Sequence, residues 1–202
     1  MTTTAADYGW FEESFPDLAE DYCFTLVRHV TPGGLLRRLG GRPEEDRTGV
    51  NAVCAAALNL ERRTGRRRRL VALTNVGAWT LMIEPSNDGG VTETTAIKAS
   101  AGTQWVSHFA DVNDQAGFLW AQDGDRRLSF DSSFPDERIG THPDELLPVM
   151  GAVGFPFGGE SADRSGVIVA AFALAEHVTG VLLRPDLLRG TTFTCGSIDP
   201  AG

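Results

Sequence analysis

The sequence HFADVNDQAGFLWAQDGDRRLSFD, residues 108–131, alternates aromatic and aliphatic residues with polar ones and is interrupted by short runs of Asp, Asn and Gly. A period of two is typical of β-strands that bury one face. Asp and Asn are favoured in tight turns because their side chains hydrogen-bond to nearby backbone and tolerate left-handed conformations. The stretch therefore predicts an antiparallel β-meander with turns at residues 111–114 and 123–125.

Metal binding is the alternative explanation for these acidic residues. Asp111 and Asn113 match the first ligand positions of an EF-hand calcium loop, but Ala116 stands where that loop requires glycine, and the bidentate Glu is missing. Asp123 and Asp125 could project from one face of a tight turn, which leaves a weak cation site open. We interpret the acidic residues as turn residues and predict neither a metal site nor a cofactor.

The same alternation continues on the N-terminal side. Residues 79–84 and 105–109 alternate apolar and polar side chains, and residues 22–28 do so well enough for a further strand. The sequence NDGG at 87–90 supplies the residues that a hairpin turn requires, so we expect residues 91–99 to form the return strand. Together these segments predict a central antiparallel sheet.

In the segments before and after the predicted sheet, apolar residues recur at helical spacing. The expected main helices contain Leu35, Leu146 and Phe172 and begin after the capping residues Thr31, Thr141 and Ser165. We expect these helices to pack on one face of the sheet. Shorter expected elements are helices at 51–60 and 185–188 and a final edge strand at 192–195.

These patterns predict an α+β fold, with a central antiparallel β-meander sheet and helices packed mainly on one face. Residues 22–202 would form a single α+β domain, and residues 1–21 an N-terminal arm or short helix. The chain has 202 residues, of which 42% are hydrophobic, so it can bury a sizeable core. We expect no secretory signal, and its longest apolar run, 167–175, is about half of what a membrane-spanning helix needs. We therefore expect a cytoplasmic protein without membrane contact.

The formal net charge of −9 argues against nucleic-acid binding, because phosphates would be repelled. Residues 62–69 nevertheless hold six of the eighteen Lys and Arg residues. Such a run can bind phosphates or an acidic partner. It contains no aromatic residue to stack on a base, which favours a solvated loop. No nucleic-acid ligand is expected.

Catalytic motifs are missing from the sequence. Cys23, Cys54 and Cys195 are odd in number and form no pair at metal-ligand or redox spacing, so buried free thiols are expected. The four histidines are scattered. His108 would be the candidate base, because aromatic and acidic residues lie beside it, but no nucleophile can be named for it to activate.

Several phrases, taken in order, resemble a known family. They are YCFTLVR at 22–28, TPGGLLRRLG at 31–40, GAWTLMIE at 77–84, SAGT at 100–103 and EHVTGV at 176–181. They look like an uncharacterised actinobacterial family classed as a domain of unknown function, over roughly residues 20–195. The resemblance implies a single domain and carries over no site residue.

Two function classes follow from these observations. The first, which the missing catalytic motifs favour, is a non-enzymatic soluble interaction protein of immunity or regulatory type, whose acidic surface binds a basic protein partner. The partner-binding residues would be Asp111, Asp114, Asp123, Asp125 and Asp131. The alternative is a small-molecule-binding protein or accessory enzyme of specialised metabolism with an aromatic-lined pocket. The pocket residues would be Trp79, Trp105, His108 and Trp120.

Overall fold

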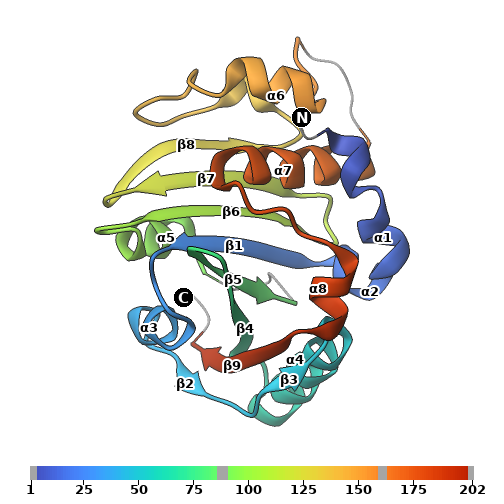
Figure 1. Cartoon of the computed structure of the whole chain (residues 1–202), viewed down its shortest axis with the longest axis vertical. Helices are drawn as coiled ribbons and strands as arrows, with labels where there is room; N and C mark the ends of the chain where they lie inside the picture. Colours follow the sequence, from blue (N-terminus) through green and yellow to red (C-terminus); the bar gives the residue numbers. More distant parts are fainter. Residues whose placement is uncertain (1–3, 86–90, 159–162, 200–202) are drawn as a thin grey trace.

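The computed structural model describes residues 4–85, 91–158 and 163–199. Their strands form an antiparallel sheet (Figure 1). The strands are β1 (Tyr22–Arg28), β2 (Arg42–Pro43), β3 (Arg47–Thr48), β4 (Arg69–Val76), β5 (Trp79–Glu84), β6 (Gln104–Ala110), β7 (Ala116–Gln122), β8 (Asp125–Asp131) and β9 (Thr192–Ile198). Their order is β2-β9-β4-β5-β1-β6-β7-β8, and β3 also pairs with β9. The first strand in sequence therefore lies in the middle of the sheet.

Helices cover the two faces of this sheet unequally. They are η1 (Ala5–Tyr8), α1 (Trp10–Ser14), α2 (Pro16–Glu20), α3 (Pro32–Arg38), α4 (Val50–Thr64), α5 (Glu93–Ala99), η2 (Pro135–Glu137), α6 (Leu147–Val153), α7 (Arg164–Thr179) and α8 (Pro185–Gly190). The long helix α7 crosses one face over β6 and β7, and the N-terminal helices, α4, α6 and α8 belong to the same layer (Figure 1). Among the helices of the described residues, only α3 and α5 pack on the opposite face. The predicted α+β class, with an antiparallel sheet, is confirmed.

The larger core packs α7 against aromatic side chains of the sheet and the N-terminal helices. The ring centroid of Phe172 lies 4.7 Å from that of Phe11, 5.1 Å from that of Phe24 and 4.4 Å from that of His108. Burying one such aromatic side chain stabilises a fold by roughly 2 to 3 kcal/mol. Because the sheet, η1 and α6 all contact α7, the helix is apolar around most of its circumference.

The smaller core forms where α3 lies against β4, β5 and β9 on the opposite face. Leu36 projects from α3 onto Gly196 of β9. A Cβ atom at Gly196 would lie 2.3 Å from Cδ1 of Leu36, which is closer than two carbon atoms can approach. Glycine at this position therefore allows the helix to approach the sheet closely.

Three sequence predictions about the faces and edges of the sheet need correction. Residues 91–99 do not form a return strand; Thr92 caps α5 by accepting a hydrogen bond from the Thr95 N–H, and the small residues of the segment pack on the sheet. The turn predicted at 87–90 lies outside the described residues. The helix containing Leu35 packs on the face opposite to Leu146 and Phe172.

The third correction concerns β9, which was expected to be an edge strand. It lies between β4 on one side and the short strands β2 and β3 on the other. The predictions for the strand at 22–28 and for helices at 51–60 and 185–188 are confirmed. The cap of α7 is Asp163 and not Ser165, because the Asp163 carboxylate accepts the N–H of Gly166.

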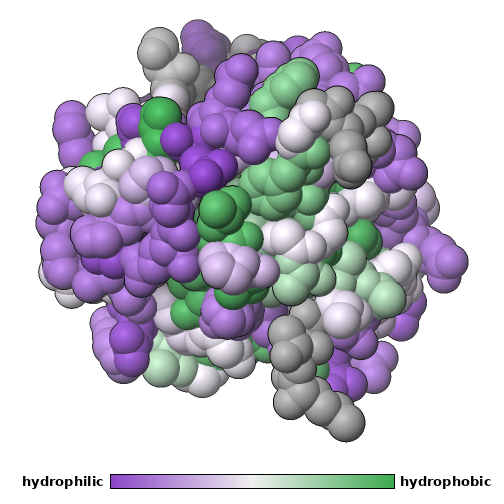
Figure 2. All heavy atoms as spheres, turned by 90° about the horizontal axis from the view of Figure 1, so that it is seen from above, coloured by the Kyte–Doolittle hydropathy of each residue, from purple (hydrophilic) through white to green (hydrophobic). Residues whose placement is uncertain are grey.

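The chain also covers the outer edge of β8. Ile139 exchanges two backbone hydrogen bonds of 2.8 Å with Ser129, and the N–H of Thr141 donates to the carbonyl of Arg126. Thr141 therefore extends this edge pairing and does not cap a helix, and α6 begins only at Leu147. Figure 2 looks onto this side of the molecule, where apolar and neutral side chains form a patch bordered by hydrophilic ones. The pairing with Ile139 blocks part of an edge that could otherwise accept a foreign strand.

In the part of the chain that the structure describes, none of the helices is both long enough and apolar enough to span a lipid bilayer.

Trp79 tests the packing of the larger core. Its side chain is buried in the helix-covered layer, with the guanidinium of Arg28 6.0 Å from the ring centroid. Trp79→Ala should lower the free energy of unfolding by roughly 3 kcal/mol or more, because it leaves a large cavity. Trp79→Phe, the matched variant, should cost less. Urea unfolding measures both, and an alanine variant with an unchanged midpoint would show that Trp79 does not support the core.

Candidate functional site

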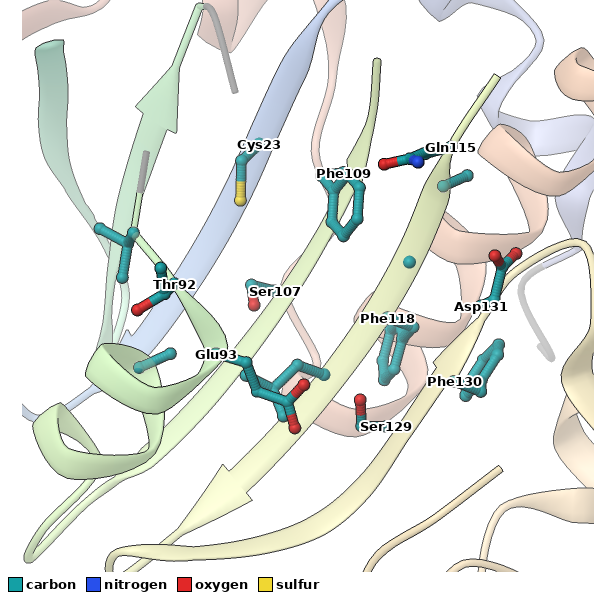
Figure 3. A pocket seen from close by; sticks show the side chains of 15 residues that line it. Cys23, Thr92, Glu93, Ser107, Phe109, Gln115, Phe118, Ser129, Phe130 and Asp131 are labelled. Atoms are coloured by element: carbon teal, nitrogen blue, oxygen red, sulfur yellow. The ribbon is translucent and has the colours of Figure 1, made fainter. Parts of the chain in front are cut away.

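The face of the sheet opposite α7 is covered only in part. α3 lies over β4, β5 and β9, and α5 lies beside β6, β7 and β8. Where β1 and β7 begin and β6 and β8 end, a pocket of about 580 Å³ opens over the sheet (Figure 3). This pocket is the candidate functional site.

The register of the strands builds the floor of the pocket from two rows of side chains. In the first row, Cys23 of β1 is paired with Phe109 of β6, which is paired with Gly117 of β7 and through it with Asp131 of β8. A second row places Ser107, Leu119 and Ser129 side by side. Directly paired residues of a sheet point to the same face, so both rows face the pocket.

Gly117 is required by the ring of Phe109. A Cβ atom at Gly117 would lie 2.6 Å from Cε1 of this ring. The ring therefore leans across β7 at the position where the strand has no side chain. Phe109 remains partly exposed and lines the pocket (Figure 3).

The start of α5 forms one wall of the pocket. Thr92 and Glu93 point into the space above the floor (Figure 3). Glu93 forms an ion pair with Arg126 of β8. Just before the helix, the N–H of Val91 donates a 2.9 Å hydrogen bond to Oε2 of Glu84 at the end of β5. These contacts fasten the wall to the sheet at two points.

Glu84 lies beside Cys23, on the neighbouring strand β5, and does not itself line the pocket. The two residues are paired across β1 and β5, and the Glu84 side chain is fully buried. Burial raises the pKa of Glu84 to about 7, while the N–H of Val91 and the Cys23 thiol favour its charged form. The second oxygen, Oε1, has no hydrogen-bond partner of normal geometry among the described residues.

The thiol of Cys23 is the one cysteine group at the pocket. Burial, followed by the nearby carboxyl of Glu84, raises the pKa of Cys23 well above its usual value. A thiol with a raised pKa stays protonated at neutral pH and is a poor nucleophile. Cys23 therefore contributes shape to the pocket floor and is not an activated nucleophile.

The structure does not bring the four predicted pocket residues together. Trp79 and Trp120 are buried in the helix-covered layer, whereas Trp105 is buried on the opposite face. None of the three, nor His108, lines the 580 Å³ pocket. Burial among aromatic rings lowers the pKa of His108 to about 3, so its imidazole is neutral at physiological pH.

The five predicted acidic residues lie at two ends of the sheet. Asp111, Asp114 and Asp131 belong to the end where β6 and β8 stop, and Asp123 and Asp125 to the other, because consecutive hairpin turns emerge at opposite ends. They do not form one continuous acidic surface. Of the five, only Asp131 lines the pocket.

The turn interpretation of these residues agrees with their geometry. The Asp111 carboxylate accepts hydrogen bonds of 2.8 and 2.9 Å from the N–H groups of Asn113 and Gln115. Asp114 and Asp123 have φ angles of 60° and 54°, in the left-handed region that Asp tolerates. Within residues 4–85, 91–158 and 163–199, no group of three or more acidic, His or Cys side chains is placed to hold a metal ion.

The pairing of Cys23 with Glu84 and the wall formed by α5 were not predicted from the sequence. One signal was present, because both residues occupy the less apolar positions of their alternating strands. Pairing these two strands in register would have placed the thiol and the carboxyl side by side. The wall could not have been found in this way, because residues 91–99 were assigned to a strand.

Comparison with protein families identifies one match, a family of unknown function (DUF6461), over residues 1–201. The chain belongs to this family. The match confirms the resemblance to a domain of unknown function, and an actinobacterial origin stays a prediction. Comparisons with curated proteins and with solved structures found no match.

Glu84 should make stability depend on pH. Its pKa is raised on folding from 4.5 to about 7, so the folded state holds the proton more tightly. Its stabilising contribution is complete below pH 4.5 and is lost as the pH rises through about 7. Glu84→Gln does not titrate, so its stability relative to wild type should increase between about pH 5 and pH 8 by on the order of 2 kcal/mol.

Urea unfolding at the two pH values measures this difference. Glu137→Gln, at an exposed carboxylate, is the matched control and should show no such change. A relative stability of Glu84→Gln that is the same at both pH values would contradict a buried carboxyl with a raised pKa.

Proposed function

We propose that this protein is a non-enzymatic binding protein that holds a small organic molecule in the pocket on the open face of its sheet. The observation that carries the proposal is the pocket itself, a concave space of about 580 Å³ over an uncovered part of the sheet. Ligand sites of proteins commonly have volumes of roughly 300 to 1,000 Å³. They combine an apolar surface with a few polar groups that orient the ligand.

The side chains that line the pocket combine apolar surface with a few polar groups in this way. Phe109 and Leu119 supply apolar surface, and the hydroxyl groups of Ser107 and Ser129 supply polar atoms. The Ser107 hydroxyl accepts the Trp105 Nε1–H at 3.0 Å, which leaves its own hydrogen to donate to a ligand. Strands and a helix carry most of these side chains, so the site needs little ordering when a ligand binds. The raised pKa of Cys23 removes the obvious nucleophile, which favours binding over catalysis.

The cytoplasmic location and the lack of a nucleic-acid ligand remain parts of this proposal. Two arginines of the basic run are engaged within the protein. Arg68 donates to Asp199 at 2.9 Å and to the Ser197 carbonyl at 2.6 Å, and Arg69 forms an ion pair with Glu61 at 3.3 Å. These contacts reduce the positive charge that the run could offer to phosphates.

A variant that fills the pocket tests the proposal. Ser107→Trp places a large side chain on the pocket floor, and Asn59→Trp places the same side chain on the exposed surface of α4 as a control. Each protein is incubated with a small-molecule extract of the native host, and the retained compounds are identified by mass spectrometry. Wild type and Asn59→Trp should retain the same compound, and Ser107→Trp should lose it.

Retention of that compound by Ser107→Trp would place its binding elsewhere. Failure of the wild-type protein to retain any compound would also argue against a small-molecule ligand. Circular dichroism of the three proteins must first show that they are equally folded, so that loss of binding cannot be attributed to unfolding.

A second candidate function is the binding of a basic protein partner, and one feature favours it. A shallow hollow beside the N-terminal helices is lined by Glu12, Glu20 and Asp114 around Val112, whose side chain is 66% exposed. Arg164 in this hollow is engaged by backbone carbonyls of Ala19, Glu20 and Asp111 and by the Asp114 carboxylate. The accessible charge is therefore mainly negative.

Charge reversal separates this second candidate from the first. Glu12→Lys with Glu20→Lys should slow association with a basic partner captured from the native host, because steering depends on local charge. Asp123→Lys with Asp125→Lys, at the other end of the sheet, should not. An association rate that is the same in both double variants and insensitive to salt would exclude the acidic hollow as the binding surface.

A further inference from the structure

The charges around the pocket have one sign. The described residues that line it include the carboxylates of Glu93 and Asp131 but no Arg, Lys or His. The buried carboxyl of Glu84 lies on β5, the strand beside Cys23 of β1. Glu93 is balanced by its ion pair with Arg126. Asp131 is exposed, and its carboxylate accepts a hydrogen bond of 2.8 Å from the N–H of Ser133.

An aromatic ring borders the same space as Asp131. Phe109 and Asp131 belong to one row of the floor and are separated only by Gly117, which has no side chain. The ring leans across β7 over this glycine and remains partly exposed within the pocket (Figure 3). An aromatic face attracts cations through its quadrupole, and a carboxylate attracts them through its charge. The two groups together form an environment that suits a positively charged head group.

We propose that the ligand of this pocket is a small organic cation, an ammonium or a related group, whose charge lies between the Asp131 carboxylate and the ring of Phe109. This inference rests on the proposed ligand pocket and adds the chemical class of the ligand. Leu119 and the other apolar parts of the floor would contact the uncharged part of the molecule. An anionic ligand would meet only carboxylates and uncharged groups there, so it would be repelled.

Three probes of equal size and different charge test the inference on the intact protein. They are benzylamine, which is a cation at neutral pH, the neutral benzyl alcohol and the anion benzoate, and calorimetry measures their dissociation constants at millimolar concentration. Benzylamine should bind at least about tenfold more tightly than benzyl alcohol, and benzoate more weakly than both.

Variants identify the groups that are responsible. Asp131→Asn keeps an acceptor for the Ser133 N–H and removes the charge, so it should weaken benzylamine binding by about tenfold and leave benzyl alcohol unchanged. Phe109→Leu should reduce the preference for the cation. Asp125→Asn, at the opposite end of the sheet, should have no effect.

The outcomes separate this inference from the proposed function. If the three probes bind equally, or benzoate binds best, and Ser107→Trp abolishes the binding, the pocket is a ligand site but the cation is the wrong class. An unchanged benzylamine affinity in Asp131→Asn would also overturn the inference. If no probe binds while wild type still retains a native compound that Ser107→Trp loses, the pocket stands and the cation inference is wrong. If Ser107→Trp binds each probe as tightly as wild type does, both the inference and the proposed ligand pocket are wrong.

Discussion

The pairing of β1 with both β5 and β6 is the constraint on which the rest of the structure depends. This strand is the first in sequence, yet it joins the two halves of the sheet. Its alternation sends Tyr22, Phe24 and Leu26 into the larger core and places Cys23 and Val27 on the opposite face. One seven-residue strand therefore contributes to the aromatic core under α7 and to the floor of the pocket.

The two faces that this strand separates differ in how they are covered. The aromatic face is closed by α7 and the N-terminal helices, and even the polar ring of His108 is buried there in its neutral form. On the other face, α3 and α5 leave part of the floor open. Next to that opening the fold keeps Glu84, a buried carboxyl whose ionisation opposes stability above neutral pH.

The sequence was most informative where one regular pattern covered a whole element. The alternation in β1, β5 and the meander predicted the antiparallel sheet, and the Thr31-Pro32 pair predicted the start of α3, where Thr31 accepts the N–H of Gly34. Prediction from the sequence failed where a short segment was compatible with both a helix and a strand. Residues 93–99 are rich in Thr and Ala, which do not distinguish a short helix from a strand, and the packing of Ala96 and Ala99 on the sheet decided in favour of α5.

The candidate site was harder to predict because it depends on register between distant strands. Composition indicated that Trp79, Trp105 and Trp120 could line a pocket, but two of them face the covered side and the third is buried under the partial layer. The acidic residues were correctly assigned to turns, yet a single acidic surface required the five of them to lie at the same end of the sheet. Only pairing across β6, β7 and β8 showed that Phe109, Gly117 and Asp131 form one row.

The most direct test of the central claim is a crystal structure of the protein with the compound that it retains from the native host. We expect electron density for the ligand in the pocket, between the ring of Phe109 and the carboxylate of Asp131, with α5 in place as the wall. Density for the compound at any other site, with the pocket filled only by water, would contradict the account.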